Sequence, residues 1–236
     1  YSSAASDVYK RQVWNMPRLG TFNLHASLLP QYRGAAPINW AVINGDTETG
    51  ITTFFLKHEI DTGEVIQQVR VPIADTDNVG IVHDKLMMLG GRLVVETVDA
   101  IIAGKVKPVP QEEMAVVGEL RPAPKIFKDT CRIDWNMPVK RIYDFIRGLS
   151  PYPAAWTELA QPDGTVVVLK IFETEKMEQP HRFSPGTLQT DSKTYIRISG
   201  TDGWISVRAL QLPGKKRLKT DELLRGFKLT EDYKVR

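Results

Sequence analysis

The spacing of apolar residues divides the chain into a first half that mixes helices and strands and a second half made mostly of short strands. Runs of β-branched and aromatic residues predict strands over 49–56 and 64–71, joined as a hairpin by the polar loop between them. Residues 37–44 predict a short helix that Gly45 ends. The longest helix is predicted over 79–103, where apolar residues recur at helical spacing and indicate a face packed on a core.

The second half begins after a change in composition. Residues 108–125 hold four prolines and no apolar period, which predicts a semi-rigid, extended linker. Asn136 is the expected N-cap of a helix ending near Arg147, and Thr220 is the expected cap of a short helix, 221–225. Between these helices, turn residues separate predicted strands at 155–160, 165–174, 186–190, 195–199 and 203–212. Strands of this length and spacing favour a small antiparallel barrel.

The segment 22–37, FNLHASLLPQYRGAAP, places an amide and an imidazole close together. Asn23 and His25 stand two residues apart at the end of a predicted strand, so their side chains point to the same face. An amide donor beside a titratable base at a strand end is a common way for an α/β enzyme to present a site. On this pair alone, a turn asparagine and a histidine satisfied within the fold remain the alternative.

This segment resembles the Asn-x-His-x-Ser-Leu-Leu-Pro signature of the folate-dependent formyltransferases, and 56–63 (LKHEIDTG) fits the same family. The resemblance implies a catalytic triad of Asn23, His25 and Asp61. N–H groups of Asn23 and His25 would stabilise an oxyanion, and Asp61 would hold the useful protonation state of His25 and help to move a proton through water. Folate would contact the two flanking loops, at Ser27, Leu28, Leu29, Pro30 and His58. Asp61-Thr62-Gly63 also matches the aspartic-protease tripeptide, but such proteases need two aspartates, so a homodimer would be required.

The resemblance covers residues 13–236 and implies an α/β fold in three parts. Residues 13–107 would be the C-terminal part of a Rossmann-like formyltransferase domain, 108–125 a linker, and 126–236 a small OB-fold-like β-barrel. Residues 1–12 (YSSAASDVYKRQ) have no apolar periodicity and no signal-peptide core, so they are expected to be a non-native leader. The first third of the family's enzyme would then be missing from this chain.

The second half resembles the members of the family that act on tRNA. Residues 147–157 (RGLSPYPAAWT) look like the start of their C-terminal domain, and 210–216 (LQLPGKK) look like its end. The implied reaction moves the formyl group of 10-formyltetrahydrofolate to the methionine amine of initiator methionyl-tRNA, in translation initiation. Basic side chains suited to phosphate contacts are Arg33, Lys215, Lys216, Arg217 and Lys219. A solvated charge run, or a structural role for Arg33, stays open.

Composition and charge narrow the function classes. Residues 1–104 hold 8 basic and 11 acidic residues, whereas 105–236 hold 23 and 17, so the second half suits a polyanionic partner. No apolar run approaches the length of a membrane span. The single cysteine, Cys131, excludes internal disulfides and thiolate metal sites and favours an intracellular, cytoplasmic protein. The histidine spacings suggest no metal, and a monomer is expected.

Two other functions remain open. Sugar-nucleotide formyltransferases, and other small-molecule enzymes that use 10-formyltetrahydrofolate, share the triad, and some carry similar appended domains. The chain could also act only as an RNA-binding module.

Overall fold

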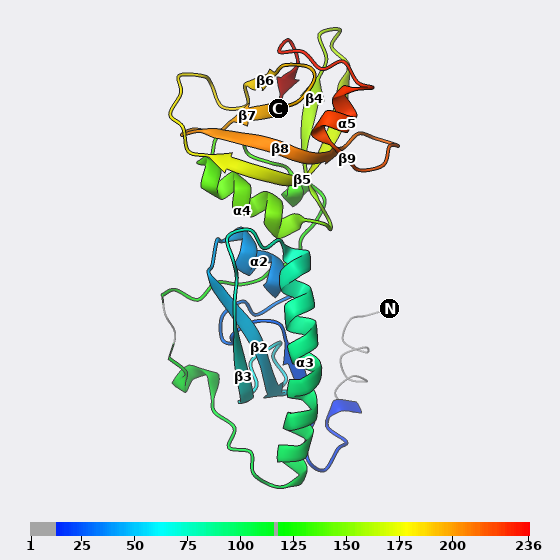
Figure 1. Ribbon diagram of the computed structural model, residues 1–236. Coiled ribbons are helices and arrows are strands. Elements are labelled where there is room, and N and C mark those ends of the chain that lie inside the picture. The colour runs from blue at the N-terminus through cyan, green and yellow to red at the C-terminus, as the bar shows by residue number, and fades with distance from the viewer. Residues whose placement is uncertain (1–12, 116–117) are drawn as a thin grey trace, which may run out of the picture. The chain divides into compact units, whose positions relative to one another are not determined.

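The computed structural model describes residues 13–115 and 118–236, which form two compact units (Figure 1). The first unit contains the described residues up to Ala41, together with 46–75 and 81–125. The second contains 42–45, 76–80 and 126–236. The expected leader at 1–12 lies outside the described residues.

The first unit is built on a three-stranded antiparallel sheet in the order β1 (Phe22–His25), β2 (Glu48–Phe55), β3 (Val65–Pro72). β2 is the central strand and is almost entirely buried. A strand buried on both faces needs no polar alternation, which explains its nearly unbroken run of β-branched and aromatic residues. The predicted hairpin of β2 and β3 is confirmed, with boundaries one residue away from those expected.

Two helices accompany this sheet, α2 (Pro37–Ile43) and α3 (Val79–Ile102), and α3 runs alongside it in Figure 1. The predicted core stripe of α3 is confirmed, since its buried side chains include Val79, Val82, Leu86 and Leu93. The helix approaches β1 closely at Gly90, where a Cβ atom would lie 2.8 Å from the Leu24 side chain. A small residue at this position therefore lets α3 pack against the strand that ends in His25.

The described residues of the segment 108–125 are hydrogen-bonded to the rest of the first unit. Val109 forms two backbone hydrogen bonds with Val65 of β3, of 2.8 and 2.9 Å, just before a 3-10 turn, η1 (Gln111–Glu113). Further along, Ala123 donates its N–H to Arg33, and the Arg121 carbonyl accepts from Tyr32, both at 2.8 Å. The segment thus borders the loop that follows β1 and helps to shape it.

The second unit is a curved antiparallel sheet with strand order β10-β4-β5-β8-β7-β6 and β9 paired to β8, which confirms the small barrel. The helix α4 (Val139–Leu149) lies along β5 and β8 in Figure 1. The strands are β4 (Ala155–Ala160), β5 (Val166–Met177), β6 (Leu188–Thr190), β7 (Ile196–Ser199), β8 (Trp204–Gln211), β9 (Leu218–Lys219) and β10 (Lys234–Val235). The helices are η2 (Asp129–Cys131), α4 (Val139–Leu149) and α5 (Thr220–Leu224).

Both predicted helix caps in this unit are wrong. The residue before α4 is Pro138, not Asn136, and the first N–H of the helix, at Val139, is bound 2.8 Å away by the Asp202 carboxylate. α5 starts at Thr220, whose hydroxyl donates to the Val207 carbonyl at 2.6 Å instead of capping the helix. At α4 the distant Asp202 takes the place of a local cap, and a sequence window cannot reveal such a partner. α5 keeps a local partner, because Glu222 accepts the Lys219 backbone N–H at 3.0 Å.

Candidate active site

The end of β1 carries both residues of the sequence pair. Pairing with β2 sets Asn23 opposite Phe54 and His25 opposite Thr52. The Asn23 side chain is exposed, whereas His25 is only 6% exposed. The loop that follows β1 returns over His25, so a buried base lies two residues from an amide that a ligand can reach.

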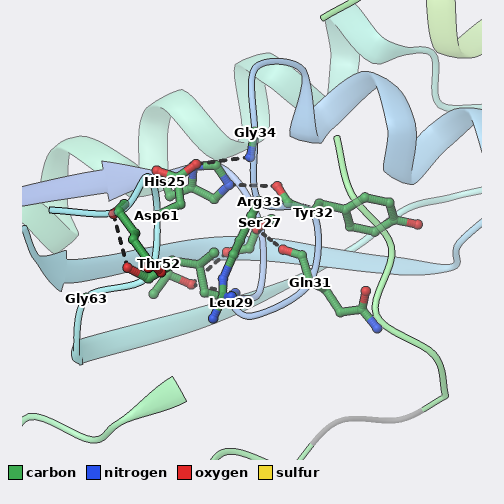
Figure 2. Close-up of polar contacts among 12 residues, drawn as sticks. His25, Ser27, Leu29, Gln31, Tyr32, Arg33, Gly34, Thr52, Asp61 and Gly63 are labelled. Atoms are coloured by element: carbon green, nitrogen blue, oxygen red, sulfur yellow. Dashed lines mark hydrogen bonds and ion pairs between the residues drawn. The ribbon is translucent and has the colours of Figure 1, made fainter. Parts of the chain in front are cut away.

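The contacts of His25 fix where its proton lies (Figure 2). Nε2 lies 2.9 Å from the Tyr32 carbonyl oxygen. Because a carbonyl can only accept, Nε2 must be the nitrogen that carries hydrogen in the neutral ring. Nδ1 then faces the Asp61 carboxylate, with Oδ2 at 3.7 Å. The imidazole is therefore oriented by one neutral partner and one acidic partner.

Tyr32 presents its carbonyl from an unusual backbone conformation. Its φ is 59°, in the left-handed region that residues other than glycine seldom adopt. Its hydroxyl donates to Asp46 Oδ2 at 2.6 Å, and Arg121 donates to Asp46 Oδ1 at 2.9 Å. With the ring anchored at this end, the backbone of Tyr32 holds its carbonyl against His25.

Asp61 is also held in the left-handed region, with φ of 57°. Its Oδ2 accepts the Gly34 N–H at 3.0 Å, and the same oxygen lies 3.7 Å from Nδ1 of the His25 ring (Figure 2). The backbone of its loop is bound by Gln111, whose Nε2 donates to the carbonyls of Asp61 and Gly63, each at 2.8 Å. The carboxylate is thus positioned from two directions.

The arrangement can take up and release a proton beside an exposed amide donor. A protonated His25 would have Asp61 as its counter-ion, and a neutral His25 has an acceptor at Nδ1. Within 13–115 and 118–236, no group of three or more His, Cys, Asp or Glu side chains is arranged to bind a metal ion. In the same residues, no helix is long and apolar enough to span a membrane.

Several close relatives of this chain carry the same name. A Bacteroides fragilis protein named methionyl-tRNA formyltransferase is 79% identical over 224 residues, which cover 95% of this chain and 69% of that protein. The chain belongs to the formyltransferase family. A relative of the same name from Bacteroides thetaiotaomicron is 77% identical over 94% of the chain and 69% of its own length. Family models match both parts, formyl transferase over 8–98 and formyl transferase, C-terminal domain over 125–228.

Solved structures show the same fold at low sequence identity. HypX from Aquifex aeolicus, in complex with tetrahydrofolic acid, gives a TM-score of 0.63 at 20% identity, over 91% of this chain and 36% of that one. The sugar 3N-formyltransferase WlaRD gives 0.59 at 20% identity, over 83% of this chain and 66% of its own. At this distance the match establishes the formyltransferase fold alone.

The side chains predicted to touch folate mostly build the loop after β1. The Ser27 hydroxyl is fully buried and donates to the Gln31 carbonyl at 2.6 Å. Leu29 is 2% exposed and belongs to a hydrophobic cluster with residues of β2 and β3, and Pro30 is buried as well. Leu28 is half-buried, unlike Leu29 and Pro30.

Two other predicted binding residues border the Asp61 loop. His58 is exposed in the turn before Asp61. Arg33 is half-buried, and its Nε and Nη2 donate to Gln111 Oε1 at 3.0 and 2.6 Å. Arg33 is therefore tied to the same glutamine that binds the Asp61 loop.

The predicted basic cluster of this formyltransferase divides into two kinds of residue. Arg217 forms an ion pair with Glu173 and lies 4.7 Å over the Phe172 ring. Lys219 is exposed, and its bond to Glu222, at 3.0 Å, comes from its backbone N–H. Lys215 and Lys216 are exposed in the turn after β8. These two lysines present their charges to solvent.

Sequence reasoning missed Gln111, Tyr32 and Arg121. All three act on the site through backbone carbonyls or through another side chain, and two of them come from the proline-rich segment 108–125. A glutamine or arginine in a segment without periodicity gives no signal until the fold brings it to the site.

Proposed function

We propose that this protein transfers the formyl group of 10-formyltetrahydrofolate to the α-amine of methionine on initiator tRNA. The observation that carries the proposal is the His25–Asp61 pair beside the exposed Asn23 amide, in a chain 79% identical to a methionyl-tRNA formyltransferase. The acceptor amine attacks the formyl carbon, the bond from that carbon to folate N10 breaks, and one proton passes from the amine to N10.

Asn23 is proposed to donate its amide N–H to the formyl oxygen, where negative charge develops during attack. Removal of such a donor typically lowers the rate by about a hundred- to a thousandfold. The side chain is exposed, so a bound formyl group can reach it. The half-buried Leu28, in the loop after β1, offers an apolar surface that fits a flat, partly apolar ligand such as folate.

His25 is proposed to take the proton that leaves the amine. Its Nε2–H is already bound to Tyr32, so the atom that can accept is Nδ1. The resulting imidazolium would face the Asp61 carboxylate, which stabilises it until the proton passes on, through water, to the folate nitrogen. This role differs from direct stabilisation of the oxyanion by a His25 N–H, because that N–H is committed to a carbonyl.

The second unit is proposed to hold the tRNA, in a monomeric, cytoplasmic enzyme. Its excess of basic residues and its exposed Lys215 and Lys216 support this proposal. Contacts of this type attract phosphate without reading base sequence. Arg217 is proposed as a weaker contributor, since its guanidinium already pairs with Glu173, whereas the side chain of Lys219 is exposed.

A transfer assay with three acceptors tests the function. Methionyl-tRNA, glycinamide ribonucleotide and an amino-sugar nucleotide are each offered with 10-formyltetrahydrofolate, and the formylated products are quantified. Transfer to methionyl-tRNA is expected. Transfer to a small acceptor alone would replace the proposal with a small-molecule enzyme, and tRNA binding without any transfer would leave an RNA-binding module.

Separate variants test whether the first unit supplies catalysis and the second unit supplies tRNA affinity. His25→Ala should abolish turnover and leave tRNA affinity unchanged. Lys215→Ala with Lys216→Ala should weaken tRNA binding and lower its salt dependence by up to about two phosphate contacts. Unchanged affinity and salt dependence in the lysine variant would remove this turn from the proposed tRNA surface.

A further inference from the structure

Gln111 is a buried polar side chain that binds the loop of Asp61. It is 1% exposed and lies in η1, near the start of the segment predicted to be a linker. Oε1 accepts two N–H groups of Arg33, at 3.0 and 2.6 Å. Nε2 donates to the carbonyls of Asp61 and Gly63, each at 2.8 Å. A primary amide has two donor hydrogens and two acceptor lone pairs, and all four are used.

The partners of this amide leave only one possible orientation. A guanidinium can only donate and the two carbonyls can only accept, so oxygen must face Arg33 and nitrogen must face the loop. The backbone that presents Gln111 is fixed as well, because Val109 pairs with Val65 through two hydrogen bonds. Gln111 is therefore a rigid bridge between β3, Arg33 and the loop of Asp61.

The loop needs such a bridge because Asp61 is held away from its preferred backbone conformation. Its φ is 57°, and from there its Oδ2 accepts the Gly34 N–H and lies 3.7 Å from His25 Nδ1. The Gln111 N–H groups bind the carbonyls on either side of Thr62. They thereby resist the rotation of the backbone that would carry the carboxylate away from His25.

We propose that Gln111 is a positioning residue that holds the Asp61 carboxylate against His25, acting through the backbone carbonyls of Asp61 and Gly63. The charged groups around His25 fit this role. Asp61 faces Nδ1 directly, Arg33 reaches the same loop through Gln111, and Asp46 is bound to the far end of Tyr32. The inference rests on the proposed function where it is tested by the rate of formyl transfer. Where it is tested by the NMR signals of His25, it rests on the geometry alone.

Two substitutions separate the two sides of the amide. Gln111→Glu keeps the acceptors for Arg33 but replaces the donors to the loop with a carboxylate oxygen. Gln111→Met, of similar length, removes both sets of bonds without introducing a charge. Both should lower kcat by roughly ten- to a hundredfold, as expected for a misplacement of a catalytic group by up to about 1 Å. KM for folate and for the acceptor should stay within about threefold.

The chain offers a matched control in Gln31. Its Nε2 donates to the Glu119 carbonyl and its Oε1 accepts the Arg121 N–H, each at 2.9 Å. It therefore ties the same segment, 108–125, to the loop after β1 without touching Asp61. Gln31→Glu should leave kcat unchanged. An equal loss of kcat in this control would show that any loosening of the segment is harmful, which would overturn the specific role of Gln111.

A measurement without substrate keeps the proposal falsifiable. The chain has four histidines, so the ring ¹⁵N signals of His25 can be assigned with one His25→Gln sample. At fixed pH, both Gln111 variants should shift the Nδ1 signal, which reports on Asp61, more than the Nε2 signal, which reports on Tyr32. If one variant does not fold, the other decides. Wild-type Nδ1 signals in a folded Gln111 variant would overturn the inference, whereas absence of formyl transfer by the wild type would overturn only the proposed function.

Discussion

Gly63 offers the sharpest test of whether the geometry of the Asp61 loop controls the reaction. An added Cβ atom would lie 1.5 Å from the Phe55 carbonyl oxygen, at the end of β2. Because a close carbon–oxygen contact is about 3.3 Å, the loop or the strand would have to move by roughly 1.8 Å to accept the methyl group. The neighbouring atom belongs to the backbone, so no side-chain rotation can relieve the clash.

The displacement has two expected consequences. It would break the hydrogen bond from Gln111 to the Gly63 carbonyl and would carry Asp61, two residues away, out of place. A misplacement of about 1 Å can lower a rate about a hundredfold, equivalent to about 2.7 kcal/mol of transition-state stabilisation. Overpacking should also lower the free energy of unfolding by about 1–3 kcal/mol. Gly63→Ala should therefore lose at least a hundredfold in kcat/KM and remain folded.

The assay compares Gly63→Ala with Gly91→Ala, using formyl transfer and thermal unfolding. A Cβ atom at Gly91, on the exposed side of α3, meets nothing within 4 Å. Alanine there should stabilise the helix by about 0.5–1 kcal/mol and leave the rate unchanged. A Gly63→Ala variant with the wild-type rate would refute the reasoning, as would an equal loss of rate in Gly91→Ala.

Three further predictions concern individual groups. Tyr32→Phe removes a hydrogen bond to the Asp46 carboxylate and should lower the free energy of unfolding by about 1.5–3 kcal/mol in a urea titration; no change would contradict the anchoring of this loop. Burial raises the pKa of the Cys131 thiol, so iodoacetamide should label it at neutral pH only after unfolding, and rapid labelling of the native protein would contradict its burial. The hydrogen bond from Arg208 lowers the pKa of Glu175, so this exposed pair should add less than about 1 kcal/mol to the free energy of unfolding above pH 4.5 and lose that contribution as the pH falls. The difference in unfolding free energy between the wild type and Glu175→Gln should therefore shrink towards acidic pH, and a difference that grows would contradict this sign.

The local pattern of the sequence determined most of the elements. The apolar stripe of α3 is the pattern of a helix buried on one face, and the β-branched run of β2 is that of a strand buried on both faces. The strands of the barrel are likewise recognisable from their short apolar runs. The spacing of Asn23 and His25 placed both on one strand, and a family signature pointed to Asp61 as their partner. The structure brings Asp61 to 3.7 Å from His25. These inferences succeed because they depend on near neighbours in the chain or on whole motifs.

The tertiary structure decided what each polar group binds. Asp202, more than sixty residues away in the chain, caps α4 in place of Asn136, and Val207 takes the hydroxyl of Thr220. The proline-rich segment supports the site through hydrogen bonds. Gln111 binds both Asp61 and Arg33, and Arg121 donates to the Tyr32 hydroxyl. Hydrogen bonds between residues this far apart leave no periodic trace in a sequence, since their geometry exists only once the intervening chain has folded. The sequence therefore determined which side chains could perform the chemistry, and the fold alone decided which atom of His25 is left to perform it.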